Sequence, residues 1–412
     1  MKIFVILLIF LSFSCGAAAQ QRSLSYFLEQ GKQNNPYLKD FENQSLSNKI
    51  DSQLLRATSQ TQVGFINNNS YAPVIRGYGY DEAITNIANV TAIVQASHSI
   101  IGRKNMAEQY RSFHLQTQAL ADTIQLAEQD LFRVITDQYI TAYGDQLTVA
   151  FNREVYDLMQ QEDSILRKLT QSGAYKQTDY LTFYVTLQQQ ELIYQQSIFL
   201  YNTDYLTINY LCGITDTTVQ SLQKPDITDS TSYDINQSVF YRRYTTDSLR
   251  LENQKALIGF EYKPKLGVYT DAGYNSSLQT TPYKNFGFSA GVNLTVPIYD
   301  GHQRRMKYSK TALQEKTRQS NRDFFLAQYH QQVAQLRQQL RSIDGLEAKI
   351  NHQISYAYTL IKANNKMLQS GDIAMKDYIT AINNYLTAKN LLTQNSVSRL
   401  KIISQLNYWN RQ

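Results

Sequence analysis

The sequence predicts a mainly α-helical fold with a small antiparallel β part, and three observations support this prediction. Only 6 Pro and 17 Gly occur among the 412 residues, so residues that break helices are rare. Two polar, Gln-rich stretches, 102–173 and 301–371, contain no Pro at all. Residues 286–298 alternate strictly between apolar and small or polar side chains, which is typical of a β-strand.

Each Pro-free stretch predicts one very long helix, at residues 103–172 and at residues 302–370. In the first stretch, apolar residues recur every three or four positions and form the narrow seam of a coiled coil. This seam contains Met106, Tyr110, Phe113, Leu120, Ile124, Ala127, Leu131 and Val134. A helix of about 70 residues is about 105 Å long. No compact domain of this size contains such a rod, so each long helix is expected to pair with other helices.

Shorter helical patterns accompany the long ones. Return helices are predicted at residues 175–212 and 375–411, and half-length helices at residues 23–59 and 233–260. Two of these shorter helices laid end to end match one long helix in length. Residues 213–232, rich in Thr, Ser and Asp, are predicted to form a linker.

An internal repeat indicates that the chain is duplicated. The pattern Q-S-G-x5-D-Y-[L/I]-T occurs twice, with Gly173 and Asp179 in the first copy and Gly371 and Asp377 in the second. In each copy the Gly falls where a long helix is expected to end, and the Asp falls where the return helix begins. The chain is therefore predicted to contain two structural repeats of similar design.

The two repeats share one predicted order of elements: a short helix, a pair of strands, a long helix and a return helix. The first repeat is predicted at residues 20–212 and the second at residues 233–412. The strand pairs are expected at about 61–101 and 262–298. The alternation is clear in the second pair and weaker in the first.

Residues 1–19 have the pattern of a secretory signal peptide. Lys2 precedes a largely apolar run, and small residues close the segment, so cleavage is expected after Ala19. Lipidation of Cys15 is the alternative reading of the same segment. After cleavage Cys212 is the only cysteine, so stability is expected to come from packing or assembly and not from an internal disulfide.

Composition and motifs argue against an enzyme and against nucleic-acid binding. The formal net charge is +6, but Lys and Arg are scattered, and the densest basic group, Arg304, Arg305 and Lys307, is too short for a nucleic-acid stripe. The five His residues lack metal-ligand spacing, and no phosphate-binding loop or nucleophile motif is found. We expect no catalytic residues, no metal and no cofactor.

A strand with one apolar face and one polar face has two common explanations. In a soluble sandwich the apolar face is core, whereas in a transmembrane β-barrel it contacts lipid. Four strands make no sandwich and cannot close a barrel alone, so their edges need neighbouring subunits. Three copies would supply twelve strands in a symmetric ring. The candidate lipid-facing residues are Phe286, Phe288, Val292, Leu294 and Val296.

Several motifs, taken in order, resemble those of the TolC-like outer-membrane efflux protein family. Asn35-Pro36-Tyr37-Leu38 resembles the family's N-P-x-L at the end of its first short helix. Pro264-Lys265-Leu266 resembles the P-x-L that opens a strand, and residues 294–301 resemble the run where a strand enters the long helix. The two G-x5-D motifs match the family's periplasmic helix turns. The resemblance covers nearly all of residues 23–411.

The resemblance implies a homotrimer in the bacterial cell outer membrane. Each subunit would give four strands to a twelve-strand transmembrane β-barrel, continuous with a periplasmic α-barrel of long coiled-coil hairpins. Such channels are passive export ducts for small toxic solutes, and they dock with a periplasmic adaptor protein and an inner-membrane pump. A conduit for type I protein secretion is an alternative of the same class. A secreted coiled-coil scaffold or adhesin that does not span the membrane is an alternative of another class.

The resemblance also implies a role for the repeated motif. Similar proteins close the duct at its periplasmic end, which makes Gly173, Asp179, Gly371 and Asp377 candidate gate and adaptor-contact residues. Taken by themselves, the Gly residues suit left-handed helix ends and the Asp residues suit the first turn of a helix, and both readings stay open. The family often has a second carboxylate three residues after the Asp of the second turn, but Thr380 stands there, so a strong cation-binding ring is not expected.

Overall fold

The computed structural model describes residues 21–81, 88–229, 235–279, 281–370 and 372–410. The predicted signal peptide at residues 1–19, with Cys15, lies outside the described residues. Gly371 of the second repeated motif also lies outside them.

The chain divides into two compact units, and each unit draws on both halves of the sequence. Unit 1 contains the chain up to Lys39, Gln125–Val239 and the chain from Phe325 onward. Unit 2 contains Asp40–Ile124 and Phe240–Phe324. The compact units therefore combine corresponding parts of the two predicted repeats, while the division of the sequence into repeats stays a prediction.

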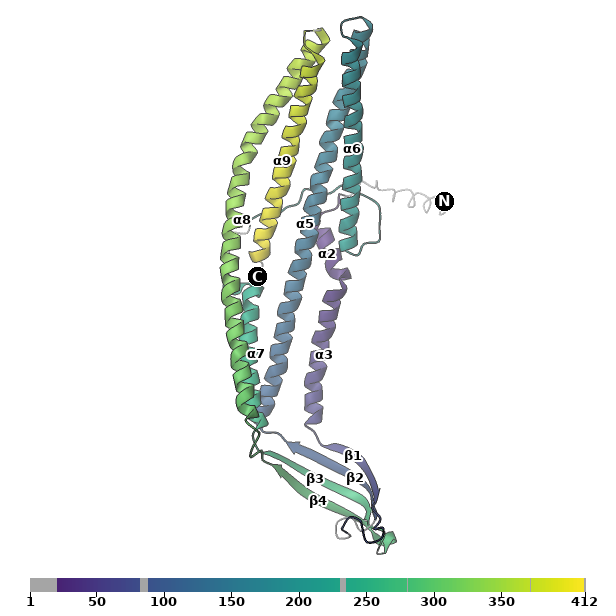
Figure 1. Cartoon of the computed structure of the whole chain (residues 1–412), viewed down its shortest axis with the longest axis vertical. Helices are drawn as coiled ribbons and strands as arrows, with labels where there is room; N and C mark the ends of the chain where they lie inside the picture. Colours follow the sequence, from purple (N-terminus) through teal and green to yellow (C-terminus); the bar gives the residue numbers. More distant parts are fainter. Residues whose placement is uncertain (1–20, 82–87, 230–234, 280, 371, 411–412) are drawn as a thin grey trace, which may run out of the picture. The chain divides into compact units, whose positions relative to one another are not determined.

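Long helices make up most of the chain. α5 has 69 residues and α8 has 68, and the absence of Pro from both explains why neither is interrupted. The helices in Figure 1 are α2 (Leu24–Asn34), α3 (Pro36–Thr58), α5 (Arg103–Gln171), α6 (Gln177–Leu211), α7 (Val239–Glu261), α8 (Gln303–Ser370) and α9 (Met375–Asn410). Short 3-10 turns lie at Ile235–Gln237 and Pro282–Lys284.

The helical pattern predicted at residues 23–59 forms two helices instead of one. Asn35 is extended (φ −69°, ψ 118°), because a residue that precedes Pro disfavours the helical conformation. The Asn35 side-chain oxygen accepts a hydrogen bond from the N–H of Tyr37 at 2.9 Å and so caps the second helix. Pro36 occupies the first position of α3, where its missing N–H costs nothing.

Unit 2 contains an antiparallel sheet of four strands in the order β1-β2-β3-β4. The strands are β1 (Gln62–Tyr71), β2 (Ala88–Ile100), β3 (Lys265–Ser276) and β4 (Phe286–Thr295). The alternation read from the sequence continues to Ile298, but β4 ends at Thr295. Pro297 has no N–H to give to a neighbouring strand, which accounts for the early end.

The core of unit 1 includes the segment that was predicted to be a linker. Leu222 is 1% exposed and packs with Phe27, Tyr139 and Ile208. The N–H of Arg22 donates to the carbonyl of Ser221 at 3.0 Å, which forms a short parallel bridge. The part of the segment around Leu222 thus packs into the core of unit 1.

The predicted fold class is confirmed: the chain is mostly helical and carries one small antiparallel sheet of four strands. Among the described residues, none of the helices is both long enough and apolar enough to cross a membrane.

Candidate functional site

The four-stranded sheet has two chemically different faces. Directly paired residues of antiparallel strands point to the same face, so the register assigns every strand residue to a face. One row across the four strands is apolar and consists of Phe65, Val94, Ala272 and Phe288. The adjacent row is small or polar and consists of Gly64, Gln95, Asp271 and Ser289. We call the sides that carry these rows the apolar face and the polar face.

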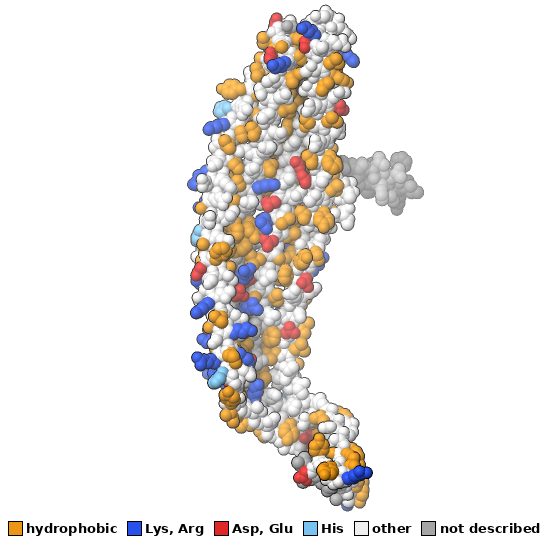
Figure 2. Space-filling view, in the orientation of Figure 1, with side chains coloured by type: hydrophobic (Ala, Val, Ile, Leu, Met, Phe, Trp, Pro, Cys, Tyr) orange, Lys and Arg blue, Asp and Glu red, His pale blue; other side chains and the backbone are white. Residues whose placement is uncertain are grey.

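The apolar face is exposed in the single chain. Phe286 is 74% exposed, Phe288 88%, Val292 69% and Leu294 61%. Hydrophobic side chains are accordingly visible on the surface of the sheet in Figure 2. A contiguous exposed face of large apolar side chains marks a surface that contacts a partner or a membrane. Val296, which was predicted to share this face, is 49% exposed and lies just beyond the end of β4.

The polar face has room for little beyond small side chains in part of its area. Tyr269 pairs with Gly291, and a Cβ atom on Gly291 would lie 2.5 Å from the Tyr269 ring. Next to them, the Ser289 hydroxyl donates to the Asp271 carboxylate at 2.8 Å. The alternation in β4 between large apolar and small residues therefore has a packing reason as well as a solvation reason.

The sheet has two open edges. β1 and β4 are at the ends of the strand order, and within the described chain the outer edge of each pairs with no other strand. An exposed strand edge presents unpaired N–H and C=O groups and is a template for pairing with another chain. The sheet is consequently incomplete as a single copy.

The second candidate site is the pair of helix turns in unit 1 (Figure 1). Gly173 has φ +80° and follows the end of α5. The N–H of Ala174 donates to the carbonyl of Leu169 at 3.0 Å, and the N–H of Gly173 donates to the carbonyl of Thr170 at 3.1 Å. A left-handed residue and two such backbone hydrogen bonds form the Schellman type of helix end, which favours Gly.

Both Asp residues of the repeated motif lie in the first turn of a helix. Asp179 is in the first turn of α6 and is half-buried, whereas Asp377 is in the first turn of α9 and is exposed. A carboxylate there interacts favourably with the N-terminal end of the helix dipole. The structural role of these residues thus has a physical basis, and their role in a gate stays a proposal.

Unit 1 holds the two turns against each other. The Tyr175 hydroxyl, from the first turn, lies 2.9 Å from the carbonyl of Leu368 and 3.0 Å from the carbonyl of Ile373, both next to the second turn. Behind them, the rings of Phe183 and Tyr378 are 6.5 Å apart in a common buried cluster. We call this packed pair of turns the tip.

Sequence reasoning missed three residues of the tip. Burial, together with the nearby carboxylates of Asp372 and Asp179, raises the pKa of Tyr175. Asn364 donates to the backbone carbonyl of Asp377 at 3.2 Å. Tyr175 occupies a variable position of the motif, where the second copy has Ile373, and Asn364 lies before the motif, so the repeat could not reveal them. Asp372 directly follows the predicted Gly371 and could have been found by its position.

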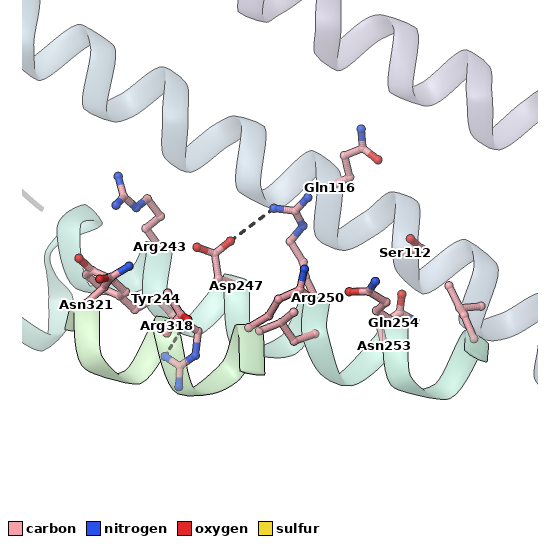
Figure 3. Close-up of a pocket in the computed structure, with 14 residues that line it drawn as sticks. Ser112, Gln116, Arg243, Tyr244, Asp247, Arg250, Asn253, Gln254, Arg318 and Asn321 are labelled. Carbon is pink, nitrogen blue, oxygen red and sulfur yellow. Dashed lines mark hydrogen bonds and ion pairs between the residues drawn. The ribbon is translucent and has the colours of Figure 1, made fainter. Parts of the chain in front are cut away.

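The helices α5, α7 and α8 of unit 2 line an open cavity of about 530 Å³ (Figure 3). Two of its Arg side chains have ion-pair partners, within the wall for Arg250 and next to it for Arg318. Arg250 lies 3.4 Å from the carboxylate of Asp247, and Arg318 lies 2.6 Å from the carboxylate of Glu315. Among the described residues, no group of three or more His, Cys, Asp or Glu is arranged to hold a metal ion.

Comparisons with known proteins were made at three levels. No protein-family model matches the chain, and no curated protein matches it. Solved structures do match over nearly the whole length. The CusC channel has a TM-score of 0.76 at 10% identity, with 95% of this chain and 93% of that chain covered.

Two further solved structures are similar to the same extent. The outer membrane protein VceC from Vibrio cholerae gives a TM-score of 0.74 at 11% identity, covering 94% of this chain and 96% of that chain. The CmeC outer membrane channel of Campylobacter jejuni gives 0.73 at 14% identity, covering 94% and 85%. CusC and CmeC are channels, and VceC is an outer membrane protein. The chain has the fold of the TolC-like outer-membrane channels, which confirms the fold that the sequence motifs implied.

Proposed function

We propose that this protein is the outer-membrane subunit of a passive export duct. The observation that carries the proposal is the sheet of unit 2, which exposes one apolar face and leaves two edges open. Lipid would cover the apolar face, as in transmembrane barrels. A neighbouring subunit would complete each open edge.

Three copies account for both features together. If β4 of one subunit pairs with β1 of the next, a closed homotrimer contains twelve strands, which is within the range of known transmembrane barrels. The polar face then lines the lumen. The long helices, with coiled-coil spacing along α5, form the periplasmic part of the duct.

A duct of this kind needs partners that supply energy. We propose that a periplasmic adaptor protein and an inner-membrane pump deliver small toxic solutes to it. The tip is the surface proposed for closing the duct and for contact with the adaptor. Gly173, Asp179, Gly371 and Asp377 are the residues proposed to act there.

Purification and bilayer recording test the proposal directly. The mature protein is expected to require detergent for extraction, to run as a trimer in size-exclusion chromatography with light scattering, and to give stepwise currents in a planar bilayer. A soluble monomer in the absence of detergent would instead support the secreted coiled-coil scaffold and reject the channel.

A further inference from the structure

A cavity lined in part by the sheet lies where the strands meet the helices of unit 2. It has a volume of about 890 Å³. Its sheet wall includes Ser99, Gly267 and Asn293, which pair in one row of the polar face. The cavity therefore opens on the same side of the sheet as the polar face.

Four cations line this cavity. Arg103 and Lys104 begin α5 just after β2. Lys263 lies just before β3, and Lys265 is the first residue of β3. The pairing of β2 with β3 places Ile100 opposite Leu266, so the two basic pairs, distant in sequence, come to the same end of the sheet. All four residues are exposed.

The positive charge of the cavity is not balanced by neighbouring carboxylates. Glu261, the carboxylate in its wall, is already paired with Lys307 of α8. Within the described chain, no ion pair is formed by Arg103, Lys104, Lys263 or Lys265. The Lys263 ammonium lies 4.3 Å from the centroid of the Phe260 ring. Like charges gathered in a concave site raise the local concentration of anions.

The cavity also has an apolar part. Ile101, Leu257 and Phe260 line it beside the cations. Sites that bind small organic molecules combine apolar walls with a few placed polar groups and have volumes of about 300–1,000 Å³. The combination fits a ligand with an anionic group on a hydrophobic body.

We propose that this cavity is a binding site for amphipathic organic anions in the lining of the duct. The proposal rests on the proposed function, because that function assigns the polar face to the lumen. Three copies would give a collar of cations where the barrel meets the helices. The collar makes the duct selective for anions and holds organic sulfonates or carboxylates on their way out.

Reversal potentials across a planar bilayer under a KCl gradient test the selectivity. The wild-type channel is expected to favour chloride. The variant with Arg103→Gln, Lys104→Gln, Lys263→Gln and Lys265→Gln is expected to lower the chloride-to-potassium permeability ratio at least about threefold. The matched control removes four exposed cations of α8 that do not line the cavity, with Arg304→Gln, Arg305→Gln, Lys310→Gln and Lys316→Gln, and is expected to keep the ratio.

Current block tests the ligand class. Naphthalene-2-sulfonate is expected to reduce the wild-type current and to leave the fourfold cavity variant unaffected, whereas inorganic sulfate at the same concentration has little effect. If the fourfold variant forms no channels, Lys263→Gln with Lys265→Gln is still expected to lower the chloride-to-potassium permeability ratio, by about half of the change expected for the fourfold variant.

The outcomes separate the two proposals. A wild-type channel without preference for chloride, or equal losses in the cavity and control variants, would overturn the anion site and leave the duct intact. Equal block by sulfate would overturn the amphipathic ligand class. A wild-type protein that forms no channels would overturn the proposed function and, with it, this inference.

Discussion

At the scale of single residues, carboxylates inside unit 1 depart from their ordinary behaviour. Burial, with the carboxylate of Asp204 on α6 next to it, raises the pKa of Asp145 on α5 to about 7. Lys401 on α9 acts in the opposite direction. Gln138 donates to the Asp204 carboxylate at 2.9 Å, which keeps that group in place between the helices.

Asp145→Asn is expected to change how the stability of the protein depends on pH. The folded pKa lies above the unfolded value of about 3.9, so the folded state binds more protons between these values and its stability falls as the pH rises from about 4 to 7. The amide does not titrate, and the variant lacks this part of the decline. The fall in Tm between pH 5 and pH 8, measured by circular dichroism in detergent, is expected to be smaller in the variant than in the wild type. An equal fall in Tm for both proteins would show that Asp145 does not titrate as the structure indicates.

Gly173→Ala is expected to loosen the first turn of the tip. A Cβ at this position has no atom within 4 Å, so the effect comes from the backbone alone, because φ is +80°. A left-handed conformation costs a residue with a Cβ about 1–2 kcal/mol, which corresponds to roughly fivefold to thirtyfold faster amide exchange of the turn. Hydrogen exchange with mass spectrometry of peptides around the turn is the measurement. Gly173→Asn is the control and is expected to show a smaller increase, since Asn tolerates this conformation better.

At the scale of elements, β4 shows how neighbouring residues of one strand acquire opposite environments. Phe288 and Ser289 are adjacent in sequence, yet they belong to the apolar face and the polar face. The period of two along a strand separates them. The same substitution made at Phe288 or at Ser289 therefore tests one face of the sheet against the other, with little other difference.

Phe288→Arg is expected to block assembly in the membrane, whereas Ser289→Arg is expected to be tolerated. An Arg on the lipid face of a barrel costs about 2–4 kcal/mol at the bilayer midplane for each subunit, and an Arg on the lumen face does not meet lipid. At position 289 it would also lie beside the Asp271 carboxylate of the paired strand. The amount of trimer in the outer-membrane fraction measures the difference. Equal yields of the two variants would contradict the assignment of the faces.

At the scale of the whole molecule, the two compact units carry the two proposed tasks. Unit 2 contains the sheet, and unit 1 contains the tip. α5 and α8 contribute residues to both units, so each task is built on helices that both units share. The similarity of the fold to solved channels extends over 94–95% of the chain, so it includes both units.

Asp179→Ala combined with Asp377→Ala is expected to raise the single-channel conductance in a planar bilayer, if the tip narrows the duct. Removal of both carboxylates weakens the first turns of α6 and α9 by about 0.3–1 kcal/mol each and loosens the closed arrangement. Glu191→Ala with Asp51→Ala removes two exposed carboxylates away from the tip and serves as the control. Conductance equal to that of the wild type in both double variants would remove the gating role and leave the channel itself intact.

Much of the fold could be predicted from local sequence patterns. The Pro-free stretches set the extents of α5 and α8, and the strict alternation located β4. The alternation in β1 and β2 is weaker, so the sequence did not predict which residues of these strands share a face. The pairing register assigned them. Asn35-Pro36 was recognised as part of a motif that ends a short helix, but only the backbone showed that a second helix, α3, begins directly at Pro36.

The sequence alone determined the type and order of the main elements and the extents of the two long helices, because helix and strand periods depend on neighbours a few residues away. Only the tertiary structure decided which distant segments meet. It placed β2 beside β3, it joined two pairs of cations around one cavity, and it packed Tyr175 against the turn near Leu368. Contacts between such distant residues depend on how whole faces pack, and no local period in the sequence records them.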